Sequence, residues 1–291
     1  MQSLHHWLKT IKTRFRIYFP LIKSLQTALL LATGLAGYMS MRCPIFHIGM
    51  IMGVMGSLFL AISGSTILNM WYDRDIDAKM QRTCDRSIPA GLVSARESFL
   101  LGLTISAIGV GWALVLDVLY GAIVFAGLIF DVVVYTIWLK RRTPWSIIWG
   151  GMAGGMPVLA GRALGYGAID WVGITLALGV LFWIPTHILT FSMRYEEDYR
   201  RAGVPTVPAV YGFQATRWVI AISSALAVLA MGFAAYGIGL TWGYLRVMAV
   251  LSLGLLGLAV FTLMKPSEKA NFLLFKYASL FMLGSMLLMV V

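Results

Sequence analysis

The chain has 291 residues, of which 59% are hydrophobic and only 12% are charged. A soluble domain carries roughly 25% charged residues, so this composition excludes an ordinary soluble protein. The formal net charge of +11 raises nucleic acid as a partner, but the placement of the basic residues argues against it. We therefore expect an all-α integral membrane protein, because helices satisfy their own backbone hydrogen bonds in lipid.

The N-terminal 23 residues are basic and contain several aromatic side chains. They predict an amphipathic helix over segment 1–19 that lies on an anionic membrane surface. A plain positively charged anchor before the first span explains the same pattern equally well. The segment lacks the short apolar core and cleavage site of a signal peptide, so we do not expect it to be removed.

Apolar runs of about 20 residues follow, each long enough to cross a bilayer. They predict a single membrane domain (1–291), built as a bundle of nine transmembrane helices around a central cavity. The predicted spans are 20–41, 45–69, 96–116, 118–139, 146–164, 168–191, 213–237, 241–264 and 271–291. Two connections, 70–95 and 192–212, are long and carry both acidic and basic residues, and we expect them to cap the cavity as active-site loops.

The basic residues lie mostly on one side of the predicted bundle. If the N-terminus is cytoplasmic, about 20 of the 23 Lys and Arg residues fall on the cytoplasmic side, including those of both long loops. This asymmetry fits the positive-inside rule. It predicts a multi-pass protein of the cell membrane whose partner is the lipid bilayer, and it explains the net charge without nucleic acid.

Glycine and proline recur inside the spans. Glycines cluster over 150–155 and again at Gly161 and Gly165, where small residues allow membrane helices to approach closely. Pro157 and Pro185 stand inside apolar segments, where we expect them to kink the helix or to open its backbone beside a cavity.

The first long loop carries the most informative spacing in the chain. If the second span continues as a helix, Asn69, Asp73 and Asp77 lie at i, i+4 and i+8 on one face. Three such oxygen-bearing side chains favour a hard cation such as Mg²⁺, which keeps further sites for water and phosphate. Arg82 and Arg86 could bind the same phosphate. The loop therefore predicts a magnesium–diphosphate site at the membrane surface; a solvated loop with balanced charges is the alternative.

Other charged residues are expected on the same side. The second long loop supplies Glu197 and Asp198, and matching loops in two halves of a membrane protein point to a shared site. Lys140 ends a span nearest the membrane and is the candidate to reach a diphosphate, whereas Arg141 fits ordinary anchoring. Asp75 would point about 160° away from the face shared by the other loop residues, so we rank it lower.

The first acidic loop reads Asn69-x3-Asp73-x3-Asp77, then Lys79-Met-x-Arg82-Thr, Arg86 and Pro89-x-Gly91. This arrangement resembles the first aspartate-rich motif of the UbiA superfamily of intramembrane prenyltransferases, and the likeness extends to about Gly212. A second segment reads Trp183-x-Pro185-x-His187, followed by Asp198-Tyr199-x2-Ala-Gly203-x-Pro205-x2-Pro208. Within the superfamily, this segment most resembles the subfamily that farnesylates haem.

Two departures from that subfamily, and one from the members that act on quinone precursors, bear on the acceptor. Lys23 is followed by Ser24 where the subfamily usually has proline, and Pro157-Val158 stands in place of a double proline. Members that act on quinone precursors carry Asp-x3-Asp in the second loop, of which only Asp198 is present here. The superfamily likeness is intact, and the acceptor stays open between haem and an aromatic ring.

The resemblance implies transfer of a farnesyl or geranylgeranyl group from a prenyl diphosphate to a lipophilic acceptor. The catalytic residues that it implies are Asp73, Asp77, Tyr135, Lys140 and Asp198. Mg²⁺ would be held by Asn69, Asp73, Asp77, Glu197 and Asp198. The diphosphate would be bound by Asn69, Arg82, Arg86 and Lys140. The prenyl group and the acceptor would contact Tyr72, Trp183, His187 and Tyr195. Interfacial aromatic residues are also common membrane anchors, and His187 could equally be a hydrogen-bonded core histidine.

Other functions fit parts of the sequence. A 4-hydroxybenzoate-type aromatic acceptor and a glyceryl-phosphate lipid are both used within the superfamily. A transporter could use the paired loops as a gate, but transporters place their polar groups near the bilayer midplane. Here the acidic residues cluster at the predicted cytoplasmic ends of the spans, which favours an enzyme.

Overall fold

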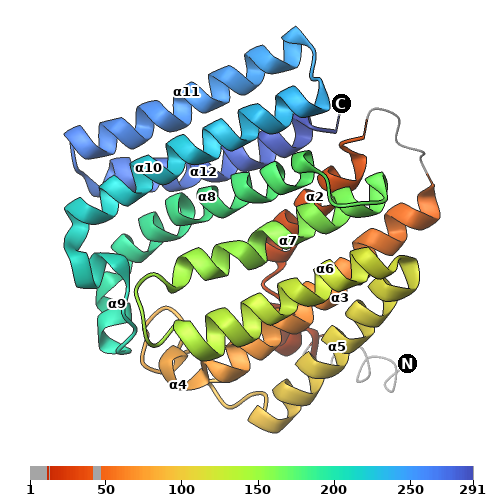
Figure 1. Cartoon of the computed structure of the whole chain (residues 1–291). Helices are drawn as coiled ribbons and strands as arrows, with labels where there is room; N and C mark the ends of the chain where they lie inside the picture. Colours follow the sequence, from red (N-terminus) through yellow and green to blue (C-terminus); the bar gives the residue numbers. More distant parts are fainter. Residues whose placement is uncertain (1–11, 13, 42–46, 291) are drawn as a thin grey trace, which may run out of the picture.

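The computed structural model describes residues 12, 14–41 and 47–290 of the chain (Figure 1). Within these residues every regular element is a helix, and no strand is found. Most of the predicted amphipathic segment 1–19 lies outside the described residues, so that helix stays a prediction.

The helices follow one another along the chain, and each predicted span contains a long one, α6 and η2 together forming one of them. They are η1 (Phe19–Ile22), α2 (Ser24–Met39), α3 (Ile48–Tyr72), α4 (Arg74–Asp77), α5 (Ala95–Leu116), α6 (Val118–Leu128), the π-helix η2 (Ile129–Leu139), α7 (Ser146–Tyr166), α8 (Trp171–Arg194), α9 (Glu196–Arg201), α10 (Val207–Ile238), α11 (Trp242–Met264) and α12 (Glu268–Leu288).

Not all of these helices could cross a membrane alone. In the described part of the chain, 7 helices are long and apolar enough, or 8 if Arg14–Ile22 and Ser24–Met39, bent by 48°, form one broken span. Helix α7 is not among them, since its glycines and Arg162 lower its hydropathy. The prediction of a helical multi-span membrane protein is therefore confirmed, whereas the count of nine is not.

Side-chain caps mark where several helices begin. Ser94, Asp117 and Asp170 each accept a hydrogen bond from the backbone N–H three positions later, at the starts of α5, α6 and α8. At the other end, Gly167 and Gly239 adopt positive φ angles and close α7 and α10. These caps satisfy backbone groups that a helix end leaves unpaired.

The central helices pack closely because glycine lines their contact. Helix α2 packs along α7, and α7 packs along α8. A Cβ atom added to Gly37 would lie 2.1 Å from the carbonyl oxygen of Val158, and one added to Gly161 would lie 2.0 Å from that of Gly34. The predicted close approach at glycine is confirmed at this crossing. It brings the faces of α2 and α7 to the centre of the bundle.

A buried arginine holds the same helices at the end opposite the acidic loops. Arg162 of α7 forms an ion pair of 2.8 Å with Asp170, the capping residue of α8, and donates to the carbonyl oxygen of Ser40 after α2. Because both charges are paired and hydrogen-bonded, the bundle keeps them inside its packed core. Helices α7 and α8 continue as helices through Pro157 and Pro185.

We expect Gly161→Ala to lower the melting temperature of the detergent-solubilised protein, because the added methyl group would meet a backbone oxygen of α2. Overpacking of this kind costs about 1–3 kcal/mol. Gly232→Ala in α10 is the matched control, since no atom lies within 4 Å of the added methyl group. Equal melting temperatures for the two variants would contradict the close α2–α7 contact.

Candidate active site

A cavity of about 410 Å³ lies among α2, α3, η2, α7 and α8. Most of its charged lining residues come from the ends of α3 and η2 and from the first loop: Asp73, Asp77, Arg82, Arg86 and Lys140. Lys23, before α2, and Asp131, in η2, also line it. Further along α2, α3, α6 and α7 the lining is apolar: Leu29, Leu30, Leu58, Ile62, Val124, Leu128 and Met156. A charged mouth joined to an apolar interior fits a ligand with an anionic head and a hydrocarbon tail.

The structure contains the predicted helical face of Asn69, Asp73 and Asp77. Helix α3 continues to Tyr72, so Asn69 is still helical, and α4 follows directly. Asn69, Asp73 and Asp77 all line the cavity, and both carboxylates are buried. Asp75 instead lies outside the cavity, where hydrogen bonds from Arg141 hold the pKa of its carboxyl below the ordinary value.

Each buried carboxylate at the mouth has a cationic partner. Lys140 Nζ donates to Asp73 Oδ2, and Arg86 Nη1 donates to Asp77 Oδ2 over 2.8 Å. Burial lowers the pKa of Lys140, but the neighbouring Asp73 carboxylate outweighs it, so the pKa lies above the ordinary lysine value. Lys140 is therefore a cation at neutral pH. Asp73 Oδ1 is buried without a hydrogen-bond partner among the described residues, 3.8 Å from Arg141 Nη2.

The π-helix η2 decides which side chains face the cavity. Asp131, Tyr135 and Lys140 all line it. In an α-helix, nine residues make about 2.5 turns, which would put Asp131 and Lys140 on opposite faces. A π-helix, bonded from i to i+5, has about 4.4 residues per turn, so nine residues make about two turns. The bond from the Lys140 N–H to the Tyr135 carbonyl oxygen has this spacing. Asp131 was not expected at the site, because the apolar run around it predicts an ordinary α-helical span.

Thr136 orients Asn69. The side-chain amide of Asn69 donates to Thr136 Oγ1 over 2.9 Å, and that hydroxyl donates in turn to the carbonyl oxygen of Asp131 over 2.8 Å. Thr136 is fully buried, so this contact fixes α3 against η2. With its amide nitrogen occupied, Asn69 presents its oxygen as the group available to a ligand.

The two acidic loops meet at one end of the bundle, where Figure 1 shows α4 and α9. Asp198 of α9 is buried and accepts the backbone N–H groups of Gln81 and Arg82 over 3.2 and 3.3 Å. It does not line the cavity. In this structure Asp198 anchors the first loop and so positions Arg82, and its role as a metal ligand stays a prediction.

Glu197 does not line the cavity. Its half-exposed carboxylate forms ion pairs with Arg200 and Arg201, on the outer face of its own helix. Those partners lie at i+3 and i+4, the spacing at which helix side chains meet. Its role as a metal ligand therefore gains no support from these contacts and stays a prediction.

Tyr72 and Tyr195 also lie outside the cavity lining. The guanidinium of Arg141 lies over the Tyr72 ring, 4.6 Å from its centre, and that of Arg82 lies 5.4 Å from the centre of the Tyr195 ring. Rings in this position stabilise cations through their π faces. Both tyrosines thus support the basic residues of the mouth, and their expected contact with the prenyl group or the acceptor stays a prediction.

A column of stacked rings forms one wall of the cavity. His187 lies between Trp183 and Phe275, with ring centres 4.8 and 4.4 Å away. Its Nδ1 atom is 3.3 Å from Ser279 Oγ. Trp183 and His187 were expected at the site, whereas Phe275 and Ser279 of α12 were missed, because no motif marks that helix.

The donor set at the mouth fits a magnesium ion. Among the described residues, no three His, Cys, Asp or Glu side chains are grouped closely enough to hold a metal by themselves. Mg²⁺ needs no such cage, because it binds one or two carboxylates and keeps water and phosphate ligands. The unpartnered oxygen of Asp73, with the oxygens of Asn69 and Asp77 beside the same cavity, provides hard ligands of the required kind.

These features define a class of protein: a helical membrane enzyme whose cavity takes an amphipathic, anionic substrate. The model of the UbiA prenyltransferase family matches residues 30–280. The chain belongs to this family and is a prenyltransferase.

Sequence relatives support the same assignment. The protoheme IX farnesyltransferase of Archaeoglobus fulgidus is 46% identical over 203 residues, which cover 70% of this chain and 71% of the relative. The protoheme IX farnesyltransferase of Pyrobaculum arsenaticum is 38% identical over 253 residues, which cover 84% and 90% of the two chains.

Solved structures share the fold. A digeranylgeranylglyceryl phosphate synthase matches with a TM-score of 0.79 at 18% identity, covering 96% of this chain and 98% of that one. A UbiA homologue from Archaeoglobus fulgidus, solved with GPP and Mg²⁺, matches with a TM-score of 0.67 at 16% identity, covering 95% and 99%. At this level of identity the likeness concerns the fold alone.

We expect Asp73→Asn to lower prenyl transfer by about 10²-fold or more, because it removes the charge from a buried oxygen at the mouth that has no hydrogen bond among the described residues. Asp75→Asn is the matched control and should retain activity, since Asp75 lies outside the cavity. Turnover of purified protein and its melting temperature would be measured together. Wild-type turnover by the Asp73 variant would contradict the assignment.

Proposed function

We propose that the chain transfers the farnesyl group of farnesyl diphosphate to protoheme, in a Mg²⁺-dependent reaction at the cytoplasmic face of the membrane. The observation that carries the proposal is the cavity, which joins a mouth of paired charges to an apolar interior. The relatives named protoheme IX farnesyltransferase support both the farnesyl donor and the haem acceptor.

The mouth suits the diphosphate. Asn69, Asp73 and Asp77 would hold Mg²⁺, which supplies charge stabilisation for the departing diphosphate. Lys140 and Arg86, now bonded to the two carboxylates, are placed to donate to the phosphate oxygens instead. Preorganised donors of this kind stabilise the charge that develops on the leaving group.

The interior suits the prenyl chain and the cation that ionisation produces. An allylic cation must meet its acceptor and not bulk water, and the apolar interior of the cavity disfavours that water. The rings of Tyr135 and Trp183 line the cavity and offer π faces that stabilise a positive charge. The leucine, isoleucine and valine side chains beyond them match a hydrocarbon tail.

His187 supports haem as the acceptor. Both faces of its ring are covered, and Ser279 Oγ lies next to Nδ1, so Nε2 is the nitrogen left for a ligand. A neutral imidazole held through its other nitrogen is a common ligand of haem iron.

We expect purified protein to release diphosphate and to farnesylate haem only when Mg²⁺ is present, with chelation abolishing the reaction and added Mg²⁺ restoring it. The test is a panel of radiolabelled farnesyl and geranylgeranyl diphosphates against haem, 4-hydroxybenzoate and a geranylgeranylglyceryl phosphate. Products with another acceptor alone would overturn the haem assignment. No product with any acceptor would overturn the proposed activity.

We expect His187→Ala to weaken haem binding by about tenfold or more, because the imidazole would no longer reach the iron. Titration of haem, followed by its Soret absorption, measures this affinity directly. His47→Ala is the matched control, since His47 precedes α3 and lies outside the cavity. An unchanged haem spectrum and affinity in the His187 variant would count against iron ligation.

A further inference from the structure

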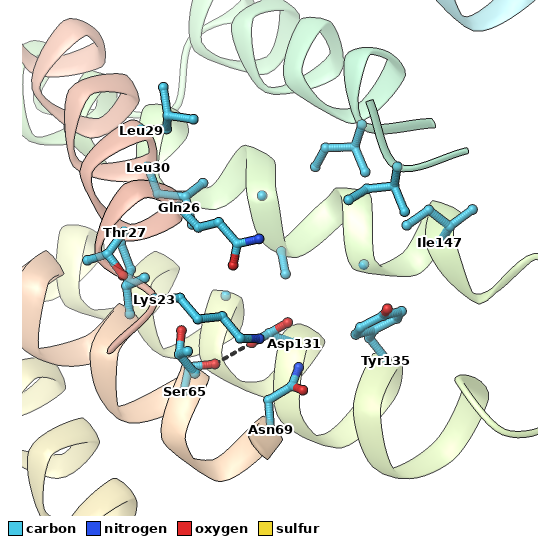
Figure 2. Close-up of a pocket in the computed structure, with 18 of the residues that line it drawn as sticks. Lys23, Gln26, Thr27, Leu29, Leu30, Ser65, Asn69, Asp131, Tyr135 and Ile147 are labelled. Carbon is cyan, nitrogen blue, oxygen red and sulfur yellow. Dashed lines mark hydrogen bonds between the residues drawn. The ribbon is translucent and has the colours of Figure 1, made fainter. Parts of the chain in front are cut away.

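Asp131 is a cavity carboxylate that the diphosphate chemistry does not use. It lies in η2, and Ser65 Oγ donates to its Oδ2 atom (Figure 2). Ser65 precedes Asp73 by eight residues in α3, which places the Ser65–Asp131 pair about 12 Å further along that helix. An ionisable residue inside a membrane span is costly, and one that faces a cavity marks a functional position.

Asp131 differs in its bonding partners from the other carboxylates that line the cavity. Asp73 and Asp77 each form an ion pair at the mouth. Within the described ranges, the Asp131 side chain has only the neutral hydroxyl of Ser65 as a hydrogen-bond donor and takes part in no ion pair. Lys23 points toward it from the start of α2 (Figure 2). A carboxylate held by one neutral donor keeps lone pairs free to accept a proton.

The proposed reaction releases one proton that needs an acceptor. The bond between C1 of the farnesyl group and the diphosphate oxygen breaks, and both electrons leave with the diphosphate. C1 then bonds to the terminal carbon of a haem vinyl group, which leaves a cation on the neighbouring carbon. A water molecule adds there, and its oxygen must lose one proton to give a neutral alcohol. An aromatic acceptor would lose a ring proton instead.

We propose that Asp131 is the general base that takes this proton, an inference that rests on the proposed prenyl transfer. Its carboxylate lies deeper in the cavity than the paired charges of the mouth, away from the expected position of the diphosphate. Ser65 is a positioning residue, because its hydroxyl fixes Oδ2 and leaves Oδ1 for the proton. Of the three carboxylates that line the cavity, Asp131 alone is not paired with a cation in the part of the chain described.

Asp131→Asn tests the assignment, because asparagine keeps the shape and can still accept from Ser65 but cannot take the proton. We expect transfer to fall by about 10²-fold or more. Ionisation of farnesyl diphosphate should persist, since it needs no base. A heavy-oxygen label in the bridging position should therefore still exchange with the non-bridging oxygens of the diphosphate at the wild-type rate.

Two further variants complete the experiment. Asp131→Glu keeps a carboxylate and should recover part of the lost transfer. Asp117→Asn is the matched control: Asp117 caps α6 outside the cavity, and asparagine caps a helix equally well, so transfer should stay at the wild-type rate.

The outcomes are distinguishable. Wild-type transfer by Asp131→Asn would overturn the base assignment and leave the proposed function intact. Loss of both label exchange and transfer would also overturn it, because Asp131 would then act in binding or folding. If the wild-type protein transfers to no acceptor in the panel, the proposed function fails and this inference falls with it.

Discussion

The site depends on the buried ion pair between Asp73, directly after α3, and Lys140, directly after η2. Removing either charge from water costs several kcal/mol, and in this apolar bundle each offsets the cost for the other. The pair therefore joins two helices that are far apart in sequence and keeps a carboxylate and an ammonium group side by side at the mouth. A diphosphate with its metal brings both opposite charges and can take over each partner, so binding need not leave a buried charge unpaired.

Hydrogen bonds and an ion pair within the protein also hold the first long loop, which carries Arg82 and Arg86. Asp198 binds two backbone N–H groups of the first loop, and Arg86 pairs with Asp77. The aromatic rings beneath Arg82 reduce the freedom of its long side chain. The mouth is thus held in one arrangement by its own charges, and little ordering is left for the ligand to impose.

Much of the fold and of the candidate site could be predicted from the sequence, and a few residue positions could not. Apolar runs located every long helix, because membrane length fixes span length. The i, i+4, i+8 spacing placed Asn69, Asp73 and Asp77 on one face, because α3 does extend beyond the apolar run. The positions of Asp131 and of Glu197 could not be predicted. The first depends on a π-helix, which has no periodic signal in the sequence. The second depends on α9, a short helix within a segment that we expected to be a loop.

The π-helix η2 places charged residues at two depths of the cavity, Lys140 at the mouth and Asp131 further inside. An α-helix of the same sequence would turn either Asp131 or Lys140 toward lipid, where a lone charge is costly. A π-helix is the less favourable backbone, and such segments are frequent at functional sites. Here it sets an ammonium at the mouth and a carboxylate deeper on one wall. That separation leaves the deep carboxylate outside the ion pairs of Lys140 and Arg86, and Lys23 is the cation that points toward it (Figure 2).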